Sequence, residues 1–252
     1  MTDESSVQLE DMTWTDVETA LEDGTRTVVV PVGSIEQHGP HLPLKMDTLA
    51  GEAVCARIAE KLGDALAGPA IQPGCSAHHM EFPGTITISP ETLMDTIESY
   101  CRSLDDHGFE CIALVPTHGG NFGPVNTVAP EVARDIDATV VALADLEENM
   151  ALMNEGMAEA GVEYQEPSIH AGAAETAVVL AVEPDLVRTD RLEPGAEGKI
   201  SGTRMINEGF DAVTENGVLG DPREGTAEAG EAIIERMATA YAEQIEAERD
   251  ID

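Results

Sequence analysis

Two carboxylates and two imidazoles lie close together near the N-terminal end of the chain. Glu36, His38, His41 and Asp47 follow directly after the apolar run 27–32. Histidine with Asp or Glu, and without Cys, is the ligand set of a hydrolytic Zn, Mn or Fe site rather than of a structural zinc site. The alternative is a polar loop whose charges face water, although such a loop rarely needs histidines among glycines and prolines. We therefore expect Glu36, His38 and Asp47 to bind metal, while His41 is a weaker candidate whose alternative role is packing.

A second group of candidate side chains follows the apolar run 111–116. His118 comes directly after this run, and taken alone it could be a core histidine in a turn. Gly119 and Gly120 let the backbone turn sharply and approach a ligand closely. Asn121 is a candidate cap for the helix that follows. Together with the first group, His118 is expected to be a ligand.

Two further segments carry histidines. His170 precedes an apolar, small-residue helix expected over 173–182, and Glu175 lies in its first turns. An acidic residue there also suits the helix dipole, but a lone carboxylate in so apolar a segment favours a functional role. His78 and His79 are adjacent and cannot both easily face one site, so one of them is expected to contact the substrate.

The composition excludes several classes of protein. The chain has 252 residues, of which 49 are acidic and 13 basic, for a net charge of −36. Such a chain should repel nucleic acid and anionic membranes, and no apolar stretch is long enough to span a membrane. Disorder is the alternative reading of strong acidity, but 42% hydrophobic residues support a packed core. We interpret the charge as adaptation to high salt, which screens repulsion.

The motifs that the sequence lacks bear on its chemistry, and the spacing of its cysteines bears on its location in the cell. No glycine-rich nucleotide-binding motif and no GxSxG motif occur. The four cysteines lack metal-binding spacing, which indicates free, mostly buried thiols in a cytoplasmic protein. The acidic N-terminal residues lack the apolar segment of a secretory signal.

Expected helices and strands alternate along the chain. Helices are expected over 9–21, 47–62, 90–107, 121–136, 173–182 and 226–249. Strands are expected over 27–32, 70–72, 85–88, 111–116 and 138–143. This rhythm predicts a single α/β domain over 1–252, with a mostly parallel sheet covered by helices on both faces. Ligands of such sheets lie outside the carboxyl ends of the strands, where the segments around Glu36 and His118 should meet.

These motifs, taken in order, resemble the creatininase (creatinine amidohydrolase) family. The resemblance rests on segments 31–47, 79–86, 118–121, 170–176 and 217–222 and covers roughly residues 10 to 245. It implies a three-layer αβα sandwich, two divalent metal ions per chain (Zn, Mn or Fe) and hydrolysis of a cyclic amide or formamide. A homo-oligomer, a hexamer by analogy, acting on a small-molecule amide is also implied.

The resemblance assigns roles to individual residues. The implied metal ligands are Glu36, His38, Asp47, His118 and Glu175. Glu36 and His118 resemble ligands of one ion and His38 a ligand of the other, with Asp47 bridging. His170 and Glu175 are the expected catalytic residues, with His170 as the acid/base group near the leaving nitrogen. Expected substrate contacts are His79, Gly119, Gly120 and Asn121.

Two departures bear on the substrate. Creatinine-hydrolysing members have Tyr-Glu in place of Gly119-Gly120 and use tryptophans in the substrate pocket, whereas the only tryptophan here, Trp14, lies outside the motifs. Relatives with the same His-Gly-Gly-Asn form include formylaminopyrimidine hydrolases of archaeal flavin and deazaflavin biosynthesis, and a peptidase that matures a peptide-derived redox cofactor. Alternatives from other classes are a metal-binding protein without catalysis and an iron oxygenase, which also uses His and carboxylate ligands.

Overall fold

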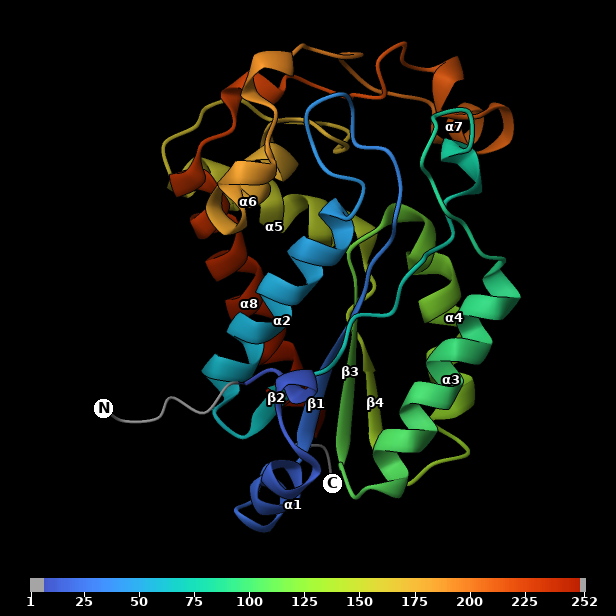
Figure 1. Ribbon diagram of the computed structural model, residues 1–252, viewed down its shortest axis with the longest axis vertical. Coiled ribbons are helices and arrows are strands. Elements are labelled where there is room, and N and C mark those ends of the chain that lie inside the picture. Colours follow the sequence, from blue (N-terminus) through green and yellow to red (C-terminus); the bar gives the residue numbers. More distant parts are fainter. Residues whose placement is uncertain (1–6, 250–252) are drawn as a thin grey trace.

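A parallel β-sheet forms the centre of the protein in the computed structural model, which describes residues 7–249 (Figure 1). Its strand order is β2-β1-β3-β4. β1 (Thr27–Val32) pairs with β2 (Ala65–Ala67) and β3 (Cys111–Pro116), and β3 pairs with β4 (Thr139–Ala142). Every residue of β1, β2 and β3 is buried. Continuous apolar runs of this kind are typical of parallel strands that are covered on both faces.

Helices cover both faces of the sheet (Figure 1). One face packs against α2 (Met46–Leu62), α5 (Leu146–Glu159), α6 (Ala173–Val182) and α8 (Ala227–Arg249), which share one core cluster. The other face packs against α3 (Pro90–Asp106) and α4 (Phe122–Val132), with α1 (Trp14–Glu22) at the edge of the same cluster. A short helix, α7 (Gly202–Glu208), lies beyond the carboxyl ends of the strands. The three-layer α/β sandwich is confirmed.

Several element boundaries follow from local hydrogen bonds. Ser89 caps α3 by accepting a hydrogen bond from the Thr92 backbone N–H at 3.2 Å, and Pro90 takes the first helical position. Gly63 ends α2 with a φ of 74°, a left-handed conformation that glycine adopts without strain. These boundaries match the sequence-based expectations closely.

Other expectations were wrong. Segments 70–72 and 85–88 form only single bridges, Val32 to Ile71 and Ile35 to Ile86, and the strand beside β1 is β2 instead. The intervening loop contains Pro73 and Pro83, which cannot donate ladder hydrogen bonds.

Two expected helices also need correction, and two further helices were not expected. The expected helix 9–21 is a 3-10 turn, Leu9–Asp11, followed by α1, because Thr13 caps a new start through a capping box with Asp16. The helix expected to run to residue 136 ends at Val132. Helices α5 and α7 were not expected, although Asp145 caps α5 by accepting from the Glu147 and Glu148 N–H groups.

The winding of the chain reverses between β1 and β3. Helix α2 connects β1 to β2 on one face, whereas α3 connects β2 to β3 on the other. Such a reversal opens a crevice at the carboxyl ends of the two strands. The segments that carry Glu36 and His118 leave the sheet at this point. Among residues 7–249, no helix has the length and apolar character needed to cross a membrane.

Candidate metal centre

Five acidic and histidine side chains meet at the crevice beyond β1 and β3. Glu36 and His38 follow β1, and His118 follows β3. Asp47 lies in the first turn of α2, and Glu175 lies in the first turn of α6. All five are buried, with Glu36 and His38 at 0% exposure. The tertiary structure therefore places together five residues that are up to 139 positions apart in the sequence.

The carboxylate oxygens face the imidazole nitrogens at short range. His38 Nε2 lies 3.5 Å from Glu36 Oε1 and 3.3 Å from Asp47 Oδ1. It also lies 3.6 Å from Glu175 Oε2. His118 Nδ1 lies 3.4 Å from Glu36 Oε1 and 3.4 Å from Asp47 Oδ2. The donor atoms thus surround a common space.

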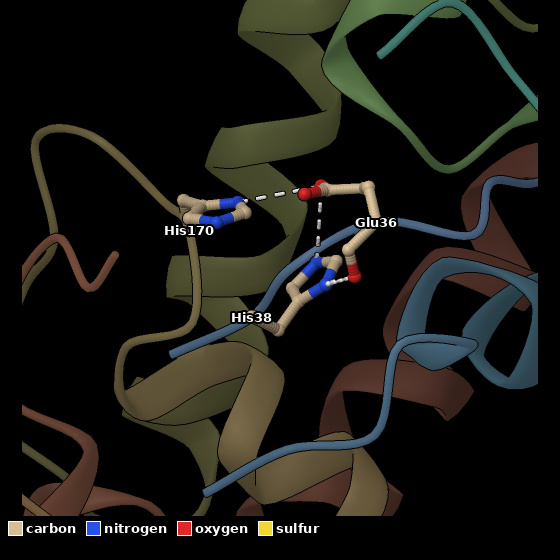
Figure 2. A group of neighbouring side chains, drawn as sticks. All are labelled: Glu36, His38 and His170. Carbon is tan, nitrogen blue, oxygen red and sulfur yellow. Dashed lines mark hydrogen bonds and ion pairs between the residues drawn. The ribbon is translucent and has the colours of Figure 1, made fainter. Parts of the chain in front are cut away.

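The donors fall into overlapping groups that could each hold a metal ion. One group is Glu36, Asp47 and His118, and another is His38, Asp47 and Glu175, so the two share Asp47. A third group joins Glu36 and His38 to His170, as Figure 2 shows. Two ions bridged by Asp47 would use the first two groups and leave His170 beside them.

The unpaired atoms of this cluster fit divalent cations. Both carboxylate oxygens of Glu36, Nε2 of His38 and Oδ2 of Asp47 are buried without a hydrogen-bond partner. Leaving a buried polar atom unpaired costs about 1–3 kcal/mol, and more for a charged group. Oxygen and imidazole donors without thiolate suit zinc or manganese, so these residues fit such ions.

Outer hydrogen bonds orient the two histidine ligand candidates. His38 Nδ1 donates to the Glu36 carbonyl oxygen at 3.2 Å, and His118 Nε2 donates to the Cys75 carbonyl oxygen at 3.2 Å. Ser76 Oγ lies 3.0 Å from the same His118 nitrogen. Each ring therefore directs its other nitrogen toward the carboxylates, which is the orientation seen in metal sites.

Burial and charge both perturb the pKa values of the cluster. Burial raises the pKa of Glu36 to about 7, although His38 beside it acts in the opposite direction. Burial opposes the charged form of His118, but the nearby carboxylates of Asp47 and Glu36 outweigh it and raise the His118 pKa to about 10. Burial, followed by the charge of His38, lowers the pKa of His170. The carboxylates thus favour added positive charge at the cluster, and His170 is held neutral.

Gln37 fixes the orientation of His170 and was not expected to have a role. Its Nε2 lies 2.9 Å from His170 Nε2 and 3.1 Å from His79 Nδ1. Its Oε1 accepts from the Gly39 N–H at 3.0 Å, which makes Nε2 the donor toward both rings. His170 therefore carries its proton on Nδ1, 3.7 Å from Glu36 Oε1 (Figure 2). The only signal in the sequence was the place of Gln37 between two candidate ligands.

An aromatic side chain covers the histidines from the other side. The Phe210 ring lies 4.3 Å from the ring of His79 and 4.4 Å from that of His170, measured between centroids. His79 Nδ1 in turn lies 2.8 Å from Glu36 Oε2. Phe210 lies outside the recognised motifs, so sequence reasoning missed it.

A cavity of about 300 Å³ opens onto the cluster. Glu36, Asp47, His118, His170 and Glu175 line one end of it. Most of the remaining lining is apolar and includes five methionines: Met46, Met150, Met153, Met205 and Met237.

Two of the four expected substrate contacts line the cavity, and the other two are absent from its described lining. His79 and Gly119 line the cavity. Asn121 does not cap α4 with its side chain. Its Nδ2 donates to the carbonyl oxygens of Val32 and Gly33, and its Oδ1 accepts from the Cys75 N–H. Asn121, which is fully buried, and Gly120 are absent from the lining described for this cavity.

The remaining expectations concern His41 and the cysteines. His41 Nε2 bonds to Thr176 Oγ1 at 3.0 Å, so this histidine packs against α6 instead of joining the cluster. All four cysteines in the described chain are free, and Cys75 is the one that is only half-buried.

Comparison with known proteins identifies relatives over nearly the whole chain. The family model described as creatinine amidohydrolase, named Creatininase, matches residues 10–245. The chain is 37% identical over 227 residues to the mycofactocin precursor peptide peptidase of Mycolicibacterium smegmatis, covering 86% of this chain and 83% of the relative. It is 27% identical over 256 residues to the creatinine amidohydrolase of Pseudomonas putida, covering 96% and 97%.

Solved structures agree with these relatives. A crystal structure of creatinine amidohydrolase matches with a TM-score of 0.82 at 27% identity, covering 98% of this chain and 100% of the other. A mutant creatininase described as Zn-Zn type matches with a TM-score of 0.81 at 27% identity, covering 98% of this chain and 99% of the other. A structure described as creatininase Mn matches with a TM-score of 0.79 at 28% identity, covering 98% and 100%. Structures similar to this one therefore carry the metals that suit its donor set.

Proposed function

The chain belongs to the creatininase family of metal-dependent hydrolases of C–N bonds, and from this membership we propose its substrate class. The protein hydrolyses an amide bond in a small, peptide-like substrate that carries an apolar group. The observation that carries this proposal is the methionine-lined cavity, because its apolar wall leads directly to the cluster of carboxylates and imidazoles. The 37% identity to a peptide peptidase supports the same substrate class.

A cyclic amide such as creatinine is the second candidate. It is favoured by the creatinine amidohydrolase relative and by the TM-score of 0.82. Against creatinine itself, Trp14 is 76% exposed on α1 and is absent from the cavity lining. A formylaminopyrimidine nucleotide is disfavoured because, among the described residues lining the cavity, the only Lys or Arg is Lys199.

The chain's own residues would divide the chemistry between holding metal and moving protons. Glu36, Asp47 and His118 would hold one divalent ion, and His38, Asp47 and Glu175 the other. When bound, such ions lower the pKa of water from about 15.7 toward 7 and polarise the amide carbonyl.

His170 would act on the leaving nitrogen. Gln37 donates to its Nε2, so the mobile proton is held at Nδ1, which faces Glu36. A neutral imidazole would donate this Nδ1–H as a hydrogen bond to the leaving group and would not transfer it. His170 would become a general acid, a role that contributes on the order of 10²–10⁴-fold, only after taking up at Nε2 the proton lost by the attacking water, in place of the hydrogen bond from Gln37. Phe210 lies against the His170 ring, and the methionines give the cavity an apolar wall. Apolar surroundings of this kind strengthen electrostatic interactions.

Turnover by metal-reconstituted protein in multimolar KCl tests the proposal. The substrates are creatinine, a formylaminopyrimidine nucleotide and pairs of short peptides with an apolar or a polar residue beside the scissile bond. We expect the apolar peptides to be cleaved faster than the polar ones. Turnover of creatinine alone would favour the second candidate, and inert protein with two bound ions would favour a binding role.

A pair of methionine variants sharpens this test. Met150 lines the cavity, whereas Met80 is 52% exposed and outside the described lining. Met150→Gln should raise KM for apolar peptides, because a polar amide then replaces apolar wall. Met80→Gln serves as the matched control and should leave KM unchanged. Equal KM values in the two variants would contradict a role for the cavity wall in substrate binding.

Other properties of the protein are part of the proposal. The family match over residues 10–245 supports one domain, and family analogy supports a homo-oligomer, with a hexamer as the expected form. Four free cysteines support a cytoplasmic location. The net charge of −36 supports adaptation to high salt and argues against nucleic-acid or membrane partners. Light scattering in multimolar KCl tests the oligomer.

A further inference from the structure

One buried carboxylate, Glu166, lies outside the metal cluster. It is 3% exposed and precedes the segment that carries His170. Its Oε1 accepts from the Ala173 N–H at 2.7 Å and its Oε2 from the Ala174 N–H at 3.1 Å. These are the first two residues of α6, whose N-cap position is occupied by a glycine without a capping side chain. Glu166 therefore supplies the acceptors that the start of this helix requires.

The backbone of Glu166 is fixed by hydrogen bonds to both its N–H and its carbonyl oxygen. Asn154 on α5 accepts from the Glu166 N–H at 3.0 Å and donates to the Glu166 carbonyl oxygen at 3.1 Å. A Cβ on Gly172 or Gly220 would overlap Glu166 Oε1. The carboxylate thus occupies a slot that two glycines leave open, and α5 fixes its backbone.

The turn held by this carboxylate is strained and carries two site residues. Ala171, between His170 and Gly172, has a φ of 53°, a left-handed conformation that costs energy for a residue with a Cβ. In this conformation its N–H donates to Glu175 Oε2 at 2.5 Å. The conformation of this turn therefore sets both the direction of His170 and the oxygen that Glu175 presents to the cluster.

We propose that Glu166 is a positioning residue that holds the His170–Glu175 turn in its strained conformation. It thereby sets the geometry of the metal position formed by His38, Asp47 and Glu175. The side-chain hydrogen bonds described for Glu166 go to backbone N–H groups and not to a candidate ligand, and Glu166 is absent from the lining described for the cavity. It acts by fixing the first N–H groups of α6, so that Glu175 leaves the helix at the angle that the cluster requires. The inference rests on the proposed role of Glu175 as a metal ligand.

Burial is consistent with a special role for this group. It raises the pKa of Glu166 to about 7, opposed by the hydrogen bonds from Ala174 and Ala173. The titratable groups that face it are Tyr164, Glu175 and Asp221. A buried carboxylate in such surroundings requires hydrogen-bond donors, and the first N–H groups of α6 supply them.

Zinc affinity of the metal-free protein, measured by competition with a chromophoric chelator, tests the proposal without relying on turnover. Glu166→Gln keeps the shape but places an amide donor against one backbone N–H. We expect zinc affinity at one of two positions to fall on the order of 10–100-fold, as for other outer partners of metal ligands. In the metal-saturated enzyme, kcat should fall with KM little changed. Glu163→Gln, an exposed residue of the same loop, is the matched control.

The outcomes separate this inference from the proposed function. Wild-type zinc affinity and kcat in Glu166→Gln, even with a lowered Tm, would mean that Glu166 is only structural and would overturn the proposal. If Glu175→Gln leaves zinc affinity unchanged, the ligand assignment itself fails. If Glu166→Gln does not fold, Asn154→Ala decides, because it loosens Glu166 while leaving its carboxylate. That variant should show a smaller loss of zinc affinity in the same direction, and no loss would count against the inference.

Discussion

Replacing Glu36 by glutamine is the most direct test of the metal cluster. Glu36 is completely buried, and it belongs to two of the three groups that could hold an ion. Neither of its carboxylate oxygens has a hydrogen-bond partner within the protein. The substitution therefore removes a negative charge and a candidate metal ligand while keeping the shape of the side chain.

The expected magnitude follows from ligand linkage. An ion present at 1,000 times its Kd stabilises the folded protein by about 4.1 kcal/mol. For a chain of this size, 1 kcal/mol shifts Tm by about 2–4 °C. Zinc should therefore raise the wild-type Tm by roughly 8–16 °C over that in chelator. In Glu36→Gln the part of this shift that comes from the ion held by Glu36, Asp47 and His118 should disappear, because that group loses one of its two carboxylates.

Without metal, the substitution Glu36→Gln should not lower the stability of the protein. Burial raises the pKa of Glu36 to about 7, so at pH 8 the metal-free wild type holds a carboxylate that the interior disfavours. We expect metal-free Glu36→Gln to be at least as stable as the metal-free wild type. The substitution thus costs stability only when zinc is present, a reversal that a merely damaged core would not produce.

Thermal melts in zinc and in chelator, together with metal content by mass spectrometry, measure these effects. Glu18→Gln, an exposed position on α1, is the control and should keep the full zinc shift. A Glu36→Gln protein that binds as much zinc as wild type and shows the same Tm shift would refute the reasoning. Loss of stability to the same extent in zinc and in chelator would also refute it.

Four further predictions follow from the described contacts. Gln37→Leu removes the amide that orients His170, so kcat should fall on the order of 10–100-fold while zinc content is kept, and unchanged kcat would contradict this role. Burial raises the pKa of Glu166 in the folded protein to about 7, above the ordinary value of 4.5 for a glutamate. The stability from its protonated form is therefore full below about pH 4.5 and lost as the pH rises through about 7. Across this window the Tm of metal-free wild type should fall relative to that of Glu166→Gln, and a constant difference would argue against the pKa. Only Cys75 should react with a thiol reagent before unfolding, because it is half-buried whereas the other three cysteines are buried, and rapid labelling of all four would be inconsistent with the fold. Raising KCl from about 0.1 M to 1 M shortens the Debye length from about 10 Å to 3 Å, so Tm should rise, and equal Tm values would exclude salt adaptation.

Local signals in the sequence predicted many elements correctly. Helix α6 and strands β1 and β3 have the expected bounds, and α2 begins one residue before expectation, at Met46. Each is marked by a cap, a glycine or an uninterrupted apolar run, all of which act within a few residues. Strand β2 was missed because three residues, Ala65–Ala67, carry no periodicity and pair only because β1 is beside them.

The donor set of the candidate site was also readable from the sequence, whereas its detailed roles were not. Residue types and motif order pointed to Glu36, His38 and His118, because carboxylate and imidazole chemistry is a property of the side chains. Asn121 shows the limit of such reasoning. It was a candidate cap for the helix that follows, but its side chain ties the end of β1 to the loop at Cys75 through contacts across 46 and 89 positions. Its expected contact with substrate stays a prediction.

The sequence by itself determined which donors are available and where the chain turns, since both depend on side-chain chemistry and neighbouring backbone. Only the tertiary structure decided that Gln37 sets the tautomer of His170 and that Phe210 covers the site. It also decided that Glu166 caps the helix carrying Glu175. These relations depend on the relative positions of β1, β3, α5 and α6, which long-range packing fixes and no local signal encodes.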